Sequence, residues 1–364
     1  MKSLKLECGT YKIEYPVHID ENAYAHIGDA IKPISPSSIF IISNKNVMDL
    51  HGEKLLSGLK KAGFDPDTVL MGDGEEHKTP DEVVSLCTRL IEKGIDRNSL
   101  LIAFGGGVTG DTGGFAAATV MRGVKYIQVP TTLVAQVDAS IGGKVGVNLQ
   151  PGKNLFGAFH HPEMVLINPR VLYTLPESEF SSGIAEVIKS AIIGSPQLMD
   201  LLEEIPAKLD EIPYDKLEKI VCHTVNVKSD IVSRDVYESG ERMKLNLGHT
   251  LGHGIESASG YKSYSHGQAI ALGILASIGV SGALGLLEDD NLENRVLKLL
   301  KKFGLPVSIS KVNIDKILNF VRMDKKREMD KIRYIVPRRI GLVEVVDIFD
   351  DCVFYNSLVN LKEE

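Results

Sequence analysis

Three of the ten histidines in this chain of 364 residues lie close together in the sequence. His249 and His253 are four residues apart, so on a helix they share one face, one turn from each other. His266 follows a polar break at 259–264 and begins the next apolar segment. Two adjacent helices would then meet at a common end, so we expect their imidazoles to converge as the ligands of a transition metal do.

A metal site of this kind needs a third ligand, and Glu186 is the best candidate. It lies in an otherwise apolar helical segment, 183–189, where a carboxylate is rarely buried without a partner. One carboxylate and two imidazoles, with positions left for water or substrate, form a catalytic zinc arrangement. A lone buried histidine is more often a hydrogen-bonded core residue, but the glycines around this set favour a site. The spacing HTLGH lacks the glutamate of HExxH, which excludes a peptidase of that type.

A second constellation is the glycine-rich stretch 105–114, which follows the fully apolar segment 100–104. It satisfies G-x-G-x-x-G between a predicted strand and a helix, where glycines and a helix N-terminus can cradle a phosphate. The stretch follows a later strand of the sheet and lacks an acidic residue about 20 positions on, so it is not an ordinary dinucleotide fingerprint. Lys144, Lys153 and Asn154 lie in nearby glycine-rich segments and suit an anionic ligand, although a loop lysine is commonly only solvated.

The elements that must hold these residues divide the chain in two. Strands predicted at 38–43, 68–71 and 100–104 alternate with helices at about 47–62 and 80–94, which indicates an open α/β sheet. From Ser178 to Phe320 the pattern is almost entirely helical, followed by a small hairpin (333–336 and 342–346) and a last helix from Cys352. A first hairpin is predicted at 4–7 and 12–15. The fold class is therefore α/β, with a Rossmann-like open-sheet domain at 1–175 and a mainly α-helical metal-binding domain at 176–364.

Composition limits the classes of function. The net charge of −7 argues against a general nucleic-acid binder, and the longest apolar run, 270–280, is too short to span a membrane. The four cysteines are far apart and form no CxxC pair, so we expect reduced thiols and a cytoplasmic protein.

Taken together, the motifs resemble those of the 3-dehydroquinate synthase family over about residues 43–341. They are Glu75-x-x-Lys78, Gly-Gly-Gly-x-x-Gly-Asp at 105–111, Met121-Arg122-Gly123, Pro130-Thr131-Thr132, Asp138-Ala-Ser-Ile-Gly-Gly-Lys144, Glu186-x-x-Lys189 and Arg242-x-x-x-Asn246-x-x-His249-x-x-x-His253. The resemblance implies a sugar phosphate cyclase with NAD and one divalent metal ion, zinc or cobalt. It implies conversion of 3-deoxy-arabino-heptulosonate 7-phosphate to 3-dehydroquinate in the shikimate pathway.

Carried over residue by residue, the resemblance assigns the metal to Glu186, His249 and His266. It assigns the substrate and catalytic contacts to Arg122, Asp138, Lys144, Asn154, Lys189, Lys228, Arg242, Asn246, His253 and either Lys325 or Lys326. It assigns the cofactor contacts to Asn44, Glu75, Lys78, Gly106, Gly107, Val108, Thr109, Gly110, Asp111, Thr131, Thr132, Asp138, Lys144, Lys153 and Thr174.

The resemblance also has consequences for specificity and assembly. Arg242 offers a planar fork for a substrate carboxylate, and the lysines and asparagines can hold a departing phosphate. Arg122 is expected to reach the active site of a neighbouring subunit, which predicts a homodimer through the N-terminal domain. Asn44 stands where the family has an acidic residue for the adenosine ribose, so the choice of NAD over NADP is left open. The segment from His253 to His266 is one residue longer than expected.

Three other functions compete with this prediction. A metal-dependent polyol or alcohol dehydrogenase would use a similar plan but needs no cluster of Lys144, Lys189, Lys228 and Arg242. Another sugar phosphate cyclase, acting on a substrate without a carboxylate, should not need Arg242. A non-enzymatic nucleotide-sensing or scaffold protein would have no reason to keep all three predicted metal ligands.

Overall fold

The computed structural model describes residues 13–150, 152–260, 263–310, 312–325 and 331–362. Its N-terminal half is built on a six-stranded sheet of order β1-β8-β5-β4-β2-β3, in which every pairing is parallel. The strands are β1 (Val17–Ile19), β2 (Ile39–Asn44), β3 (Asp67–Met71), β4 (Leu100–Gly105), β5 (Lys125–Pro130) and β8 (Met164–Ile167). The predicted α/β class with an open parallel sheet is confirmed.

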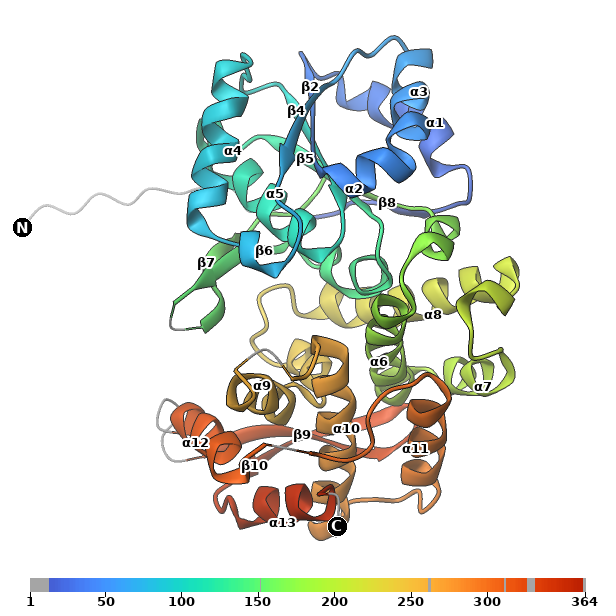
Figure 1. Ribbon diagram of the computed structural model, residues 1–364, viewed down its shortest axis with the longest axis vertical. Coiled ribbons are helices and arrows are strands. Elements are labelled where there is room, and N and C mark those ends of the chain that lie inside the picture. The colour runs from blue at the N-terminus through green and yellow to red at the C-terminus, as the bar shows by residue number, and fades with distance from the viewer. Residues whose placement is uncertain (1–12, 151, 261–262, 311, 326–330, 363–364) are drawn as a thin grey trace, which may run out of the picture.

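Both faces of this sheet are buried, and its central strand β4 has no polar side chain at any position. In β2, Phe40 and Ile42 pack in one hydrophobic cluster with α4 (Pro80–Glu92) and α5 (Gly107–Thr119). Ile39 and Ile41 point the other way, toward α1 (Ala23–Ile31) and α3 (Glu53–Lys61). Figure 1 shows these two helix layers on opposite sides of the sheet. Strands buried on two faces need no alternation of polar residues, which is why they appear as continuous apolar runs.

The C-terminal half is mainly helical and packs beneath the sheet domain (Figure 1). Its helices are α6 (Glu177–Gly194), α7 (Pro196–Glu204), α8 (Tyr214–Arg234), α9 (His249–Ala258), α10 (His266–Ala283), α11 (Leu292–Lys302), α12 (Ile314–Lys325) and α13 (Cys352–Asn360). The predicted hairpin is present as antiparallel β9 (Ile332–Arg339) and β10 (Leu342–Ile348). By length and composition α10 could cross a membrane, but 72% of it is buried between its neighbours, so it is the central helix of this half.

Several elements differ from the predicted ones. The helix predicted at 47–62 is interrupted by a π-helical turn at Met48–Gly52, between a first turn, α2 (Lys45–Val47), and α3. Lys144, Lys153 and Asn154 lie on an antiparallel ribbon, β6 (Lys144–Leu149) and β7 (Gly152–Phe159), and not on loops as predicted. The hairpin predicted at 4–15 falls almost wholly outside the described residues. Among the described cysteines, Cys87, Cys222 and Cys352 are free thiols.

Candidate active site

Three helices bring the predicted metal ligands together. Glu186 comes from the middle of α6, whereas His249 and His266 are the first residues of α9 and α10. Nε2 of His266 lies 3.1 Å from Oε1 of Glu186, and Nε2 of His249 lies 3.6 Å from the same oxygen. One candidate ligand atom from each of the three residues lies within 4.8 Å of the others. This is the cluster that the sequence predicts.

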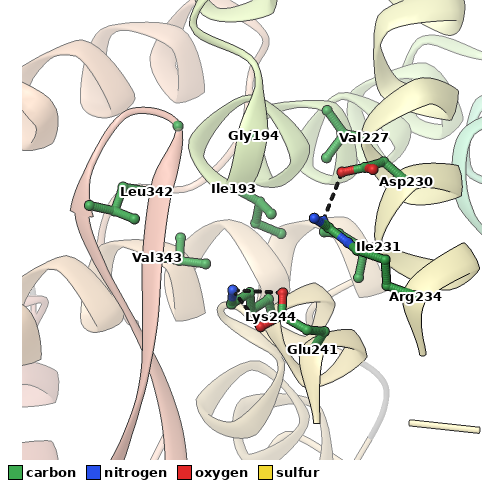
Figure 2. Close-up of a pocket in the computed structure, with 11 residues that line it drawn as sticks. Ile193, Gly194, Val227, Asp230, Ile231, Arg234, Glu241, Lys244, Leu342 and Val343 are labelled. Carbon is green, nitrogen blue, oxygen red and sulfur yellow. Dashed lines mark hydrogen bonds and ion pairs between the residues drawn. The ribbon is translucent and has the colours of Figure 1, made fainter.

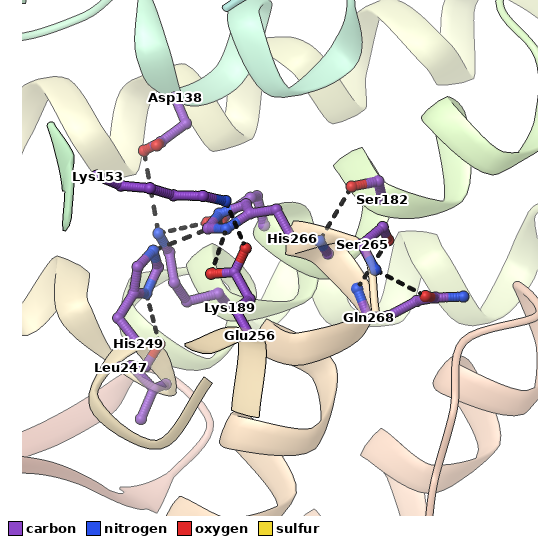
Figure 3. Close-up of polar contacts among 12 residues, drawn as sticks. Asp138, Lys153, Ser182, Lys189, Leu247, His249, Glu256, Ser265, His266 and Gln268 are labelled. Atoms are coloured by element: carbon purple, nitrogen blue, oxygen red, sulfur yellow. Dashed lines mark hydrogen bonds and ion pairs between the residues drawn. The ribbon is translucent and has the colours of Figure 1, made fainter. Parts of the chain in front are cut away.

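The starts of α9 and α10 are shaped to allow this approach. Gly248, before α9, has a φ of 77°, a left-handed conformation that side chains disfavour. A side chain at Gly267 would put its Cβ 2.3 Å from the Cα of Ser182, so only glycine lets α10 pack this closely on α6. Ser265 and Gln268 form a capping box at the start of α10, which fixes where the helix begins and therefore where His266 points (Figure 3).

The electrostatics of the cluster suit a cation. Glu186 is only 1% exposed, and Nζ of Lys189, one turn later on α6, lies 2.5 Å from its Oε2. Burial opposes the charge of Glu186, but Lys189 and the histidines outweigh it and hold the pKa of Glu186 well below its usual range. Burial, together with Lys189, lowers the pKa of His249 to about 3, so this imidazole is neutral as a metal ligand must be. An anionic carboxylate, that of Glu186, and a neutral imidazole, that of His249, thus lie close together. These residue types fit a divalent metal.

His266 is held between two carboxylates, one of which the sequence prediction missed. Nδ1 of His266 lies 3.5 Å from Oε2 of Glu256, a buried residue of α9. Burial opposes a positive charge on His266, but its hydrogen bonds to Glu186 and Glu256 raise its pKa to about 9. Glu256 also accepts a hydrogen bond of 2.9 Å from Nζ of Lys153 (Figure 3). His253 completes the group, with its ring centroid 5.3 Å from that of His249.

A row of cationic and amide groups extends from the metal cluster. Nζ of Lys228, on α8, donates to Oδ1 of Asp138 at 2.6 Å and to the main-chain oxygen of Asp138 at 2.7 Å. Lys189 lies 3.9 Å from the same carboxylate, which is in the π-helical turn η5 (Ala135–Ala139). Burial opposes ionisation of Asp138, but Lys228 and Lys189 lower its pKa to about 2. Asp138 therefore pairs with two buried lysines beside the predicted metal. Burial lowers the pKa of Lys228, whereas for Lys189 the effect of burial is outweighed by Glu186 and Asp138, which raise its pKa.

A second carboxylate that the sequence prediction missed is Glu238. Its Oε1 accepts from Nδ2 of Asn246 at 2.7 Å, and its Oε2 is paired with Nζ of Lys144. Glu238 lies between α8 and the 3-10 helix η8 (Glu241–Asn246), in a left-handed conformation with φ of 60°. Glu238 thus contacts two of the predicted substrate-binding residues, Asn246 and Lys144. No spacing motif marks it, because its partners are brought to it only by the fold.

Arg242 is the buried guanidinium of this region. Its Nη1 donates to the carbonyl oxygens of Gly142 and Val236, at 3.1 and 2.5 Å, and its Cζ lies 5.8 Å from the ring centroid of Phe159. A Cβ at Gly142 would lie 2.4 Å from Nη2, and the φ of Gly142 is 98°, so the turn requires glycine. Three of the guanidinium's five donors are left for a ligand or solvent by these two bonds.

The predicted cofactor residues gather at the carboxyl ends of the strands. The glycine-rich turn joins β4 to α5, and the first turn of α5 contains Gly107, Val108, Thr109 and Gly110. A Cβ at Gly105 would lie 2.6 Å from Oγ1 of Thr109, and one at Gly106 would lie 3.0 Å from Cγ2 of Thr132. The backbone N–H of Thr131 donates to the carbonyl oxygen of Gly105. The turn is therefore closely packed and suited to a phosphate at a helix N-terminus.

Most other predicted cofactor residues surround this turn. Nζ of Lys78 donates to Asp111 at 2.7 Å and to Oδ1 of Asn154 at 2.6 Å. Oε1 of Glu75 accepts from Nδ2 of Asn148, on the ribbon, at 2.7 Å. Asn44 caps α2 by accepting from the N–H of Val47. Oγ1 of Thr174 lies 3.0 Å from Nε2 of His51.

Two predicted contacts lie apart from these groups. Arg122 is exposed, has a φ of 67° and follows α5 at the edge of the sheet domain. Lys325 is the last residue of α12, and Lys326 lies outside the described residues.

A cavity of about 250 Å³ lies elsewhere, between the end of α6, α8, η8 and β10 (Figure 2). None of its lining residues belongs to the predicted site. Its two basic side chains, Arg234 and Lys244, are paired with Asp230 and Glu241 at 2.8 Å each. We therefore assign the chemistry to the histidine cluster and not to this cavity.

Comparison with known proteins agrees with the motifs. The family model "3-dehydroquinate synthase N-terminal" matches residues 68–182, and "3-dehydroquinate synthase C-terminal" matches residues 183–327. A 3-dehydroquinate synthase from Thermodesulfovibrio yellowstonii is 42% identical over 348 residues, which cover 95% of this chain and 96% of that protein.

Solved structures show the same architecture. A 2-epi-5-epi-valiolone synthase from Streptomyces hygroscopicus subsp. jinggangensis 5008, with NAD+ and Zn2+ bound, matches with a TM-score of 0.89 and 26% identity over 98% of this chain and 99% of that chain. A 2-deoxy-scyllo-inosose synthase complexed with carbaglucose-6-phosphate, NAD+ and Co2+ matches with a TM-score of 0.84 and 25% identity over 94% and 95% of the two chains. Together with the family models and the near-full-length relative, these matches show that the chain belongs to the 3-dehydroquinate synthase family.

Proposed function

We propose that this protein is a 3-dehydroquinate synthase. It converts 3-deoxy-arabino-heptulosonate 7-phosphate to 3-dehydroquinate and phosphate, with NAD and one zinc or cobalt ion as cofactors. The observation that carries the proposal is the cluster of Glu186, His249 and His266 beside a row of buried cations. A substrate with both a carboxylate and a phosphate matches such a row in a protein of net charge −7. The 42% identical relative bears the same name.

The proposed assignment gives each group of side chains a task. When bound, NAD and the metal supply a reversible hydride acceptor and a Lewis acid that polarises the substrate hydroxyls. Arg242 holds the carboxylate, while Lys144, Asn154 and Asn246 hold the phosphate end and stabilise charge as it leaves. Lys189 and His253 lie next to the metal ligands and are the candidates to manage the hydroxyl proton. Elimination, reduction and an internal aldol closure then complete the reaction.

Two alternatives are less well supported. A metal-dependent polyol or alcohol dehydrogenase would need the metal cluster but not the buried Arg242, whose side-chain hydrogen bonds to two main-chain carbonyl oxygens leave its charge for an anionic ligand. A cyclase for a substrate without a carboxylate shares the architecture, as the 2-deoxy-scyllo-inosose synthase complexed with carbaglucose-6-phosphate illustrates. Arg242 distinguishes the two cyclases, because a carboxylate prefers a guanidinium fork.

The test is a comparison of substrates. The holoenzyme should release phosphate and form 3-dehydroquinate from the carboxylate-bearing heptulosonate phosphate. It should act far more slowly on a heptulose phosphate that lacks the carboxylate. Arg242→Leu should remove most of this preference, whereas Arg89→Leu, a change at a partly exposed residue of α4 that pairs with Glu82, should keep it. Equal turnover of both substrates by the wild-type enzyme would favour a cyclase whose natural substrate lacks the carboxylate.

The remaining expectations belong to the same proposal. We propose a homodimer through the N-terminal domain, a cytoplasmic location, and a division into domains at 1–175 and 176–364. The exposed position of Arg122 supports the proposed homodimer. The change from a parallel sheet to helices before α6 supports the last.

A further inference from the structure

We propose that Glu256 is a positioning residue for the metal ligand His266, and that Lys153 holds Glu256 in place from the β6–β7 ribbon. The inference rests on the proposed metal site at Glu186, His249 and His266. It adds two residues to that site, neither of which is among the three ligands.

The geometry around His266 carries the first step. Its two ring nitrogens face two different carboxylates: Nε2 lies 3.1 Å from Oε1 of Glu186, and Nδ1 lies 3.5 Å from Oε2 of Glu256. Glu256 is 2% exposed and lies one turn after His253 on α9. A buried carboxylate that faces Nδ1 at 3.5 Å favours a proton on that nitrogen, which leaves the lone pair of Nε2 directed toward Glu186 and His249. Such outer carboxylates fix the tautomer and orientation of a metal-bound histidine.

Other roles for Glu256 explain less. Its helix is otherwise uncharged apart from the two histidines, so Glu256 is not part of a solvated face. A purely structural carboxylate would not need to meet the metal-binding imidazole, and burying it costs stability unless it is paired. His253, Glu256 and His266 can themselves be drawn as a cation-binding group. His266 belongs both to that group and to the cluster of Glu186 and His249, so one ion cannot use the two groups in the same way. A comparison of Glu256→Ala with His266→Ala separates the two groups.

Lys153 supplies the second step. Its Nζ donates to Oε1 of Glu256 at 2.9 Å, so the two oxygens of Glu256 have different partners, one lysine and one histidine. Lys153 is on β7, in the ribbon that follows the glycine-rich cofactor region, whereas Glu256 is on α9. Figure 3 shows Lys153 reaching across to Glu256 beside His266. The ion pair therefore links the ribbon of the sheet domain to the metal site of the helical domain.

The experiment measures metal binding directly, without substrate. Zinc dissociation constants are determined by competition with a chromophoric chelator for the wild type, Glu256→Ala, Glu256→Gln, Lys153→Met and, as a ligand variant, His266→Ala. Glu241→Gln, an exposed residue of η8 with its own lysine partner, is the matched control. The Co2+-loaded forms are compared by their visible absorption bands, which report ligand geometry, and the metal-free forms by their thermal unfolding.

We expect Glu256→Ala to weaken zinc binding by about 10–100-fold and to shift the cobalt bands. Glu256→Gln, which keeps the shape and an acceptor oxygen, should lose less, and Lys153→Met should lose less still. If Glu256→Ala does not fold, Glu256→Gln carries the test. Zinc affinity and cobalt bands unchanged in both Glu256 variants would overturn the inference. So would a loss in Glu256→Ala as large as that in His266→Ala, because Glu256 would then be a ligand. Unchanged zinc affinity in Lys153→Met would overturn the role of Lys153.

These outcomes are distinct from failure of the proposed function. If the wild type binds zinc tightly and the Glu256 and Lys153 variants bind it equally well, only the positioning role of these two residues is refuted. A wild type that binds no divalent metal removes the proposed metal site, and the inference with it.

Discussion

Nδ2 of Asn44 donates to Oδ1 of Asp73 at 3.0 Å, and this hydrogen bond joins the carboxyl ends of the neighbouring parallel strands β2 and β3. By the sequence resemblance, Asn44 is expected where the family has an acidic residue for the adenosine ribose. The structure therefore places a carboxylate beside that position, supplied by the next strand. We propose that a carboxylate there repels the 2′-phosphate of NADP as one on β2 would.

The first prediction concerns this carboxylate. Asp73→Asn should raise the affinity for NADP relative to NAD by about tenfold, because one repulsive charge near the protein surface contributes on the order of 1–4 kcal/mol at close range. Dissociation constants for both nucleotides, from quenching or calorimetry, check this. Asp67→Asn, at the start of β3, should leave the ratio unchanged. If Asp73→Asn also leaves it unchanged, Asp73 does not select the cofactor.

The second prediction concerns the metal. Glu186→Gln, His249→Ala and His266→Ala should each lose bound zinc after gel filtration, because each removes one of three ligands. Chelation of the wild type should abolish activity with the fold retained, and zinc or cobalt should restore it. His18→Ala, at an exposed position of β1, is the control and should keep its metal. Full zinc content in all three ligand variants would contradict the assignment.

The third prediction concerns Asp235, whose carboxylate organises the loop that presents Glu238 and Arg242. It accepts from the backbone N–H groups of Ser239, Gly240 and Arg242, at 2.9, 2.7 and 3.0 Å. These hydrogen bonds lower the pKa of Asp235 below its ordinary value of 3.8. A group whose folded pKa is lowered stabilises the fold above its unfolded pKa and loses this contribution as the pH falls.

Asp235→Asn should therefore lower the melting temperature and kcat/KM at neutral pH, and its difference from the wild type should shrink as the pH falls below about 4. Melting temperatures from pH 7 to pH 3 measure this difference. Asp230→Asn, an exposed carboxylate of α8 paired with Arg234, is the control and should show a smaller effect. A deficit in Asp235→Asn that grows on acidification would show that the sign is wrong.

The fourth prediction concerns the homodimer. Arg122→Ala and His249→Ala should each be inactive as pure proteins. If Arg122 completes the neighbouring subunit's site, a heterodimer of the two variants contains one intact site. After subunit exchange, an equal mixture should regain about a quarter of wild-type activity. If Arg122 acts only within its own subunit, mixing restores nothing, and an active monomer in light scattering would likewise refute the role in trans.

Local patterns were enough to predict much of this molecule. The spacing of His249 and His253 and the apolar run of β4 indicated a helix face and a doubly buried strand, and both are present. Glu256 and Glu238 were not predicted, because their partners are remote in sequence and only the tertiary fold brings them together. The β6–β7 ribbon was missed because its glycines interrupt the alternation that marks a strand. Sequence spacing reports the repeat of one element, whereas a site also depends on how elements pack.

We propose that NAD acts as a catalyst in this protein and is not consumed. To eliminate phosphate, the enzyme must remove a hydrogen from the carbon adjacent to the one that bears the phosphate. In the substrate this hydrogen is too weakly acidic for a side chain to remove. Oxidation of the adjacent ring hydroxyl to a ketone acidifies that hydrogen and permits elimination, after which the hydride is returned. The metal ligands and the glycine-rich turn must therefore serve one site, between α9, α10 and the carboxyl ends of the strands.

The most direct measurement is therefore the amount of phosphate and of NADH formed per substrate molecule consumed. Metal-loaded enzyme is incubated with the heptulosonate phosphate and much less NAD than substrate, and both inorganic phosphate and the absorbance of NADH are followed. Phosphate equal to the substrate, with no net accumulation of NADH, is the predicted result. NADH formed in proportion to the substrate consumed, with no phosphate released, would contradict the cyclase and favour a dehydrogenase.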